Sequence, residues 1–190
     1  KHNRDILQAC LDRNLDVRVV TNATIINDRL LDYLKKIKNL ELQISIDGHG
    51  DAYEFARYPG KWETVSRNIE LLNQELPGKN IHYNCVVQPM TLHSIPQLLD
   101  FLNKTKRPTR LTWMVNPDYQ SFVILTDQEK ASVLQYIQEQ LPQLTLTRQQ
   151  IEYFEKLPDS FARCEFDPAL REMFIQRLGQ IVRHRKFDFD

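Results

Sequence analysis

Polar side chains that can bind a small ligand alternate along one short stretch of the chain. In "LQISIDG" (42–48), Gln43, Ser45 and Asp47 occupy every second position, and the residues between them are apolar. Successive side chains of a strand point to opposite faces, so these three share one face. An amide, a hydroxyl and a carboxylate can hydrogen-bond the hydroxyls and charged groups of a ligand. We therefore interpret this face as part of a site.

The ends of the predicted strands carry the same type of residue. Four strands end at Asn22, Asp47, Gln88 and Asn116. In α/β barrels and open α/β sheets, ligands bind at the carboxyl ends of the strands. The alternative is that Asn and Asp occur there because turns and helix caps favour them. We favour the site.

The elements that position these residues follow from periodicity. Apolar residues at helical and alternating spacing predict a repeated helix–strand order up to residue 126, and mainly helices after it. Asn27 and Thr126 are predicted helix caps. The predicted helices span 5–13, 62–76, 95–103, 127–141 and 168–186, with one more after Asn27; the strands span 15–22, 42–47, 81–88 and 110–116; 48–61 is a loop.

Strands that alternate with helices pair in parallel, because a parallel crossover needs about a dozen residues. The sequence therefore predicts an α/β fold, a layer of about four parallel strands with outer helices and a helical C-terminal tail. We expect two parts, the α/β layer over 1–126 and the helical extension over 127–190.

Composition excludes several classes of protein. The 190 residues have a formal net charge of zero, so no general field attracts nucleic acid. No apolar run is long enough to span a membrane. Cys10, Cys85 and Cys164 lie far apart and have no CxxC spacing, which indicates neither a disulfide framework nor a metal site. We expect a cytoplasmic setting.

An ordered set of motifs resembles the middle of a radical S-adenosylmethionine (SAM) enzyme, most closely the SPASM/twitch branch. The set comprises "VVTNA" (19–23), "LQISIDG" (42–48), Arg57, "KWETVSRNIELL" (61–72) and "NCVVQPMTLHSIPQLLDFL" (84–102). The resemblance covers roughly residues 5–105. It implies that the parallel strands belong to a partial (βα) barrel over residues 1–126, and that the chain is a fragment that forms part of the SAM pocket.

The chemistry that the resemblance implies is reductive cleavage of SAM at a [4Fe–4S] cluster. The resulting 5′-deoxyadenosyl radical would abstract hydrogen from a peptide or small-molecule substrate. Ser45 matches a Ser that hydrogen-bonds SAM, and Asp47 would accept from ribose hydroxyls. Arg67 would pair with the SAM carboxylate, and Arg57 would organise the loop in which it lies. For Arg67 the alternative is a solvated side chain on the helix surface.

The resemblance also assigns the rim of the SAM site. Asn22 and Gln88 would line it, and Val87 and Val115 would flank the adenine. For both valines the ordinary interpretation as core residues is the stronger one, because apolar strand residues are usually buried.

Two motifs of the family are absent. The CxxxCxxC loop that holds the cluster does not occur, and neither does a GGEP-like motif that contacts the SAM amino group. We therefore expect a segment clipped at both ends, whose parent protein holds SAM and the [4Fe–4S] cluster, and we assign no metal ligand in this chain.

A rival interpretation comes from another functional class. The chain could be a cofactor-free α/β module that binds a partner through the 48–61 loop and the helical tail. This interpretation predicts that Ser45, Asp47 and Gln88 are scattered or paired internally, and that the tail exposes an apolar patch. The SAM interpretation predicts that they converge on one cleft with Arg67 at its edge.

Overall fold

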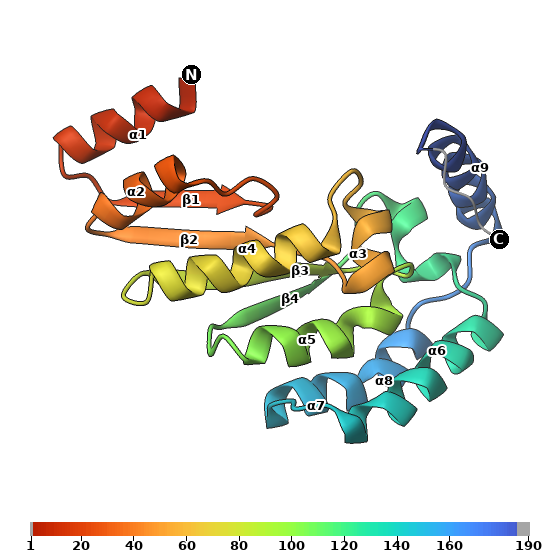
Figure 1. Cartoon of the computed structure of the whole chain (residues 1–190). Helices are drawn as coiled ribbons and strands as arrows, with labels where there is room; N and C mark the ends of the chain where they lie inside the picture. Colours follow the sequence, from red (N-terminus) through yellow and green to blue (C-terminus); the bar gives the residue numbers. More distant parts are fainter. Residues whose placement is uncertain (1, 186–190) are drawn as a thin grey trace.

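A computed structural model describes residues 2–185 of the chain (Figure 1). The strands are β1 (Val17–Thr21), β2 (Leu40–Ser45), β3 (Asn80–Val87) and β4 (Thr109–Trp113). The α-helices are α1 (His2–Asp12), α2 (Asp28–Lys36), α3 (Gly50–Ala56), α4 (Trp62–Glu75), α5 (Ile95–Asn103), α6 (Asp127–Gln140), α7 (Arg148–Glu155), α8 (Leu157–Ala162) and α9 (Pro168–Arg185). Short 3₁₀ turns are η1 (Leu92–Ser94), η2 (Asp118–Gln120), η3 (Phe122–Ile124) and η4 (Leu141–Gln143).

The four strands form one sheet in the order β1-β2-β3-β4, and every neighbouring pair is parallel. The predicted α/β fold with four parallel strands is therefore confirmed. A helix connects each strand to the next, which is the connection that parallel pairing requires.

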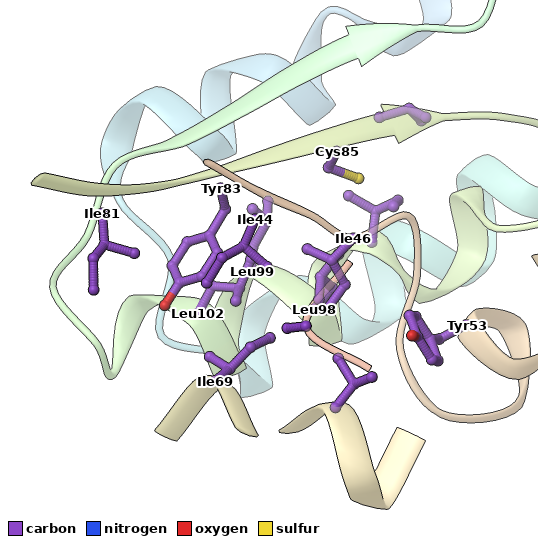
Figure 2. Packing of buried hydrophobic residues seen from close by; sticks show 14 of the residues in the cluster. Ile44, Ile46, Tyr53, Ile69, Ile81, Tyr83, Cys85, Leu98, Leu99 and Leu102 are labelled. Atoms are coloured by element: carbon purple, nitrogen blue, oxygen red, sulfur yellow. The ribbon is translucent and has the colours of Figure 1, made fainter. Parts of the chain in front are cut away.

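One face of the sheet is covered and the other is open. Ile44 and Tyr83 lie on the covered face, where they pack with Ile69 of α4 and Leu99 of α5 (Figure 2). All four side chains are fully buried. Helices α2, α4 and α5 run along the strands on this side (Figure 1). On the open face, no residue of the four strands is buried.

Two predicted helix caps are confirmed. The side chain of Asn27 accepts a hydrogen bond from Leu30 N at the start of α2. Thr126 and Glu129 form a complete capping box at the start of α6. A second capping box, formed by Thr147 and Gln150 at α7, was not part of the sequence prediction.

The prediction of a loop over 48–61 is wrong in part, because this segment contains the helix α3. Tyr53 of α3 is fully buried in the core, so this segment is held by packing although its glycines suggest a loop. Strand β2 also ends earlier than predicted, at Ser45, so that Asp47 lies just beyond the strand.

The helical tail packs on the same core as the sheet. Phe154, Leu157 and Phe161 of α7 and α8 belong to the main hydrophobic cluster. Helix α9 differs, because none of its described side chains is buried, and Figure 1 shows it set apart from α6–α8. Lys186, the last residue of the predicted helix, lies outside the described residues. The division of the chain at residue 126 stays a prediction.

Candidate functional site

The open face of the sheet carries two rows of polar side chains. The first row comes from the amino-terminal half of the strands and is paired within itself. Arg18 Nη2 donates to Gln43 Oε1 at 2.8 Å, and Arg18 Nε lies 3.4 Å from Glu41 Oε1. His82 Nε2 lies 3.4 Å from the same Gln43 oxygen. These contacts join the side chains of this row to one another.

The second row has no such partners. Ser45, Asn84 and Arg110 stand opposite one another on β2, β3 and β4, because Ser45 pairs with Asn84 in register and Asn84 with Arg110. Within residues 2–185, none of these three side chains forms a hydrogen bond or an ion pair. A hydroxyl, an amide and a guanidinium on neighbouring strands are therefore available to one ligand.

Asp47 lies next to this row but its carboxylate is occupied. Its Oδ1 accepts from Val86 N at 2.8 Å, and its Oδ2 lies 2.5 Å from Arg57 Nη2. Asp47 is only 7% exposed. The carboxylate thus ties the end of β2 to β3 and to the end of α3, in agreement with the expectation that Arg57 organises its loop.

The other predicted rim residues are dispersed. Asn22 is exposed, and its Oδ1 accepts from Thr24 N and Thr24 Oγ1 in a local turn. Gln88 is buried just beyond β3. Val87 is fully buried in the core, whereas Val115 is 71% exposed beyond β4.

Arg67 is not brought to the open face. It lies on α4, whose buried residues Val65, Ile69 and Leu72 pack against the covered face of the sheet. Arg67 itself is exposed to solvent. Its assignment to the SAM carboxylate stays a prediction, and Arg110 is the arginine that the fold aligns with Ser45.

Sequence reasoning did not single out Asn84 or Arg110 as site residues. Both occupy positions of alternating polarity, in "NIHYNCVV" and "TRLTW". That alternation is the signal that marks the open face, but the alignment of Asn84 and Arg110 with Ser45 depends on strand register. Register becomes known only when the strands are paired.

The cysteines do not fit an iron–sulfur cluster. Within the part of the chain that the structure describes, no group of three or more His, Cys, Asp or Glu residues is arranged to hold a metal ion. Cys85 is fully buried, and burial raises the pKa of its thiol. Cluster ligands are thiolates, so Cys85 is a poor candidate.

An aromatic cluster supports the loop beyond β2. His49 lies against Trp62, with ring centroids 4.4 Å apart, and Trp62 also contacts Tyr53 and Phe101 edge-on. Burial lowers the pKa of His49, and the charge of Lys104 lowers it further. His49 is therefore a packed, neutral imidazole at neutral pH.

No protein-family model matches the chain, and no curated protein matches it. Among residues 2–185, no helix is long and apolar enough to cross a membrane.

Comparison with solved structures does find a similar fold. SuiB of Streptococcus suis bound to S-adenosylmethionine matches 73% of this chain and 31% of its own, with 18% identity and a TM-score of 0.50. A further SuiB structure matches 72% of this chain and 33% of its own, with 18% identity and a TM-score of 0.50. A domain of pyruvate-formate lyase-activating enzyme from Bacteroides vulgatus matches 75% of this chain and 86% of its own, with 15% identity and a TM-score of 0.46.

The match to SuiB shows a shared fold and confirms the partial barrel. The chain spans about a third of SuiB's length, 31% in the SAM-bound structure.

Proposed function

We propose that the open face of the sheet binds S-adenosylmethionine through Ser45, Asn84 and Arg110. The observation that carries the proposal is the second row, three complementary polar side chains in register on neighbouring strands, with no partner among residues 2–185. The motif resemblance to radical SAM enzymes supports it. So does the fold shared with SuiB, a structure of which contains SAM.

The chemistry of the three groups matches the methionine and ribose parts of SAM. The Arg110 guanidinium would pair with the carboxylate, since arginine binds carboxylates with two parallel hydrogen bonds. Asn84 and Ser45 would hydrogen-bond the remaining polar groups of the methionine part or the ribose hydroxyls. In this proposal Asp47 reaches SAM only at the rim, because Arg57 and Val86 N already occupy its oxygens.

The remaining assignments of the sequence analysis complete the proposal. Gln88, Asn22 and Val115 would lie at the rim, and the backbone of Val87 would lie near the adenine. Reductive cleavage of bound SAM to a radical requires a [4Fe–4S] cluster. The cysteines described above do not fit such a cluster. The proposed work of this chain is therefore to bind and orient SAM and to exclude water. We also propose that the substrate of the SAM-dependent reaction is a peptide or a small molecule.

A binding experiment on this chain tests the proposal. SAM is titrated into the protein in a calorimeter, and Ser45→Ala and Arg110→Gln are compared with the parent chain. Loss of a charged hydrogen bond costs more than loss of a neutral one, so Arg110→Gln is expected to weaken binding by roughly tenfold to a hundredfold. Ser45→Ala is expected to weaken it by about tenfold or less.

Arg67→Gln is the matched arginine variant in the same titration. Unchanged SAM affinity is expected, because Arg67 lies on the outer side of α4. Loss of affinity in Arg67→Gln together with normal affinity in Arg110→Gln would return the assignment to Arg67. Absence of SAM binding in the parent chain would reject the proposal for this chain.

A second candidate function is partner binding by a cofactor-free module. Two observations favour it: Asp47 is paired internally, and the tail exposes Phe166, Met173 and Ile175, which are 39%, 44% and 54% exposed. The SAM titration separates the two functions, because a module of this kind binds no SAM.

A further inference from the structure

A cavity of about 920 Å³ opens at the carboxyl end of β4. Its walls come from residues 113–115 at the strand end, from the η2–η3 segment, and from the link between α8 and α9. Its volume falls within the range of small-molecule sites, roughly 300–1,000 Å³. Of the residues that the sequence analysis assigned to a site, only Val115 lines it.

The interior of this cavity is mainly apolar and aromatic. Trp113 and Phe122 meet edge-on there, with ring centroids 4.5 Å apart. Met114, Phe166 and Leu170 also line the cavity. Such a surface favours a ligand with an aromatic or branched aliphatic body.

The charged groups of the lining are mainly negative. Asp118 and Glu165 are exposed, and neither carboxylate has a hydrogen-bond or ion-pair partner among residues 2–185. Asp167 also lines the cavity, but its Oδ1 accepts from Ala169 N and Leu170 N at the start of α9. Arg163 is the single positive residue of the lining.

We propose that this cavity binds an organic cation, a small primary amine with an aromatic or branched aliphatic body. The apolar walls would hold the body, and Asp118 and Glu165 would attract the ammonium group at the mouth. The cavity lies at the carboxyl end of β4, and Arg110 of the proposed SAM face lies on the same strand, so its ligand would serve as substrate. Only this last step depends on the proposed function.

The cavity contains its own fluorescent reporter. The chain has two tryptophans, so Trp62→Phe leaves Trp113 alone. This protein is titrated with 2-phenylethylamine, 2-phenylethanol and 3-phenylpropionate, which share a phenyl body and carry a positive, no and a negative charge. The amine is expected to bind about tenfold more tightly than the propionate, with the alcohol between them.

Charge variants test the role of the two carboxylates. In Asp118→Asn combined with Glu165→Gln, the preference for the amine over the propionate should disappear while the alcohol still binds. The matched control is Glu63→Gln combined with Glu70→Gln on α4, which changes the net charge equally and should keep the preference. Arg163→Gln should strengthen amine binding, because it removes a like charge.

Thiol labelling gives a second readout that needs no change in the cavity. Cys164 lines the cavity and is partly exposed, whereas Cys85 is fully buried. In Cys10→Ser, 2-phenylethylamine should therefore slow the reaction of Cys164 with a maleimide. The proposal is overturned if no probe changes Trp113 emission or protects Cys164, or if the propionate binds as tightly as the amine.

These experiments are carried out without SAM, so their result is independent of the SAM titration and each proposal can be rejected by itself. Amine binding without SAM binding would reject the proposed function and keep the cavity as a site. SAM binding without amine binding would reject only the cavity.

Discussion

Asp47 has a structural role beside the candidate site, and the neighbouring side chains are the ones available to a ligand. A carboxylate at a strand end is a natural ligand group, yet Arg57 Nη2 and Val86 N already occupy both of its oxygens. It therefore holds β2, β3 and α3 in place beside the unpaired row. The hydroxyl of Ser45, two residues earlier at the end of β2, remains available to a ligand.

Asp47→Ala is expected to lower the free energy of unfolding by about 3 kcal/mol, because it leaves the Arg57 guanidinium and the Val86 N–H without their partner. Urea denaturation of the variant and the parent chain measures this difference. Glu41→Gln, which loses an exposed contact with Arg18, is the control and should change stability by less than about 0.5 kcal/mol. Equal effects of the two substitutions would contradict the structural role of Asp47.

His49 makes stability depend on pH. Burial lowers its pKa in the folded protein below the ordinary value of 6.5, so the unfolded chain takes up the proton first as the pH falls. Stability is therefore expected to be greatest above pH 6.5 and to decrease as the pH falls below this value.

Urea midpoints at about pH 7.5 and about pH 5.5 for the parent chain and His49→Phe measure this contribution. The variant should lose less stability on acidification. A smaller pH dependence should remain in it, because burial also lowers the pKa of His93. An unchanged pH dependence in His49→Phe would show that His49 is protonated without penalty.

Among the elements, α9 packs against η2 and η3, and an ion pair joins it to α6. Both terminal nitrogens of Arg171 donate to the Glu129 carboxylate, at 2.6 and 2.8 Å, and Nη1 also donates to Ile124 O. The hydrogen bond from Arg171 is the largest cause that lowers the pKa of Glu129 to about 2. This pair joins α9 to the capping box of α6, and the same helix forms one wall of the cavity.

Arg171→Ala is expected to release α9 and leave the rest of the fold intact, because no described side chain of α9 is buried. Amide hydrogen exchange in α9 should then become faster by tenfold or more, which corresponds to a loss of about 1.4 kcal/mol of local stability. The exchange rates of α4 should stay unchanged. Arg177→Ala, on the same helix and without an ion pair among the described residues, is the control.

The contact between Glu129 and Arg171 also weakens on acidification, as the contribution of His49 does, but at lower pH. The pKa of Glu129 is depressed, so its contribution is complete above the ordinary value of 4.5 and is lost as the pH falls toward about 2. Protection factors in α9, which are corrected for the intrinsic pH dependence of exchange, should therefore be higher at neutral pH than at about pH 2 to 3. Equal protection factors in the parent chain at the two pH values would contradict the attachment by this pair.

At the scale of the whole molecule, the sheet formed by the described residues has two edge strands. Among residues 2–185, β1 and β4 each pair with only one strand, so each leaves a row of backbone groups without a sheet partner. Val20 on β1 adds a side chain that is 60% exposed. Such edges promote association between chains.

We therefore expect reversible self-association that grows with concentration in sedimentation experiments. Val20→Lys should reduce it, because a charged residue on an edge strand opposes pairing with another chain. Ile25→Lys, at a loop position that is 76% exposed, should have a smaller effect. A parent chain that stays monomeric at all concentrations would contradict this prediction.

Periodicity and capping residues alone were enough to predict the parallel α/β fold, because helical and alternating spacing can be recognised without contacts. They also identified Asn27, Thr126 and the polar face that carries Ser45. The helix α3 was missed, since its stability comes from the burial of Tyr53 and not from a local pattern.

The composition of the candidate site depended on the tertiary structure. Strand register aligns Arg110 with Ser45, and the packing of α4 turns Arg67 away from the open face. The ion pair of Asp47 joins residues from separate elements, and the cavity beside Val115 forms between segments some fifty positions apart in the chain. Such relations arise only when distant segments pack together, so a single sequence read locally does not contain them.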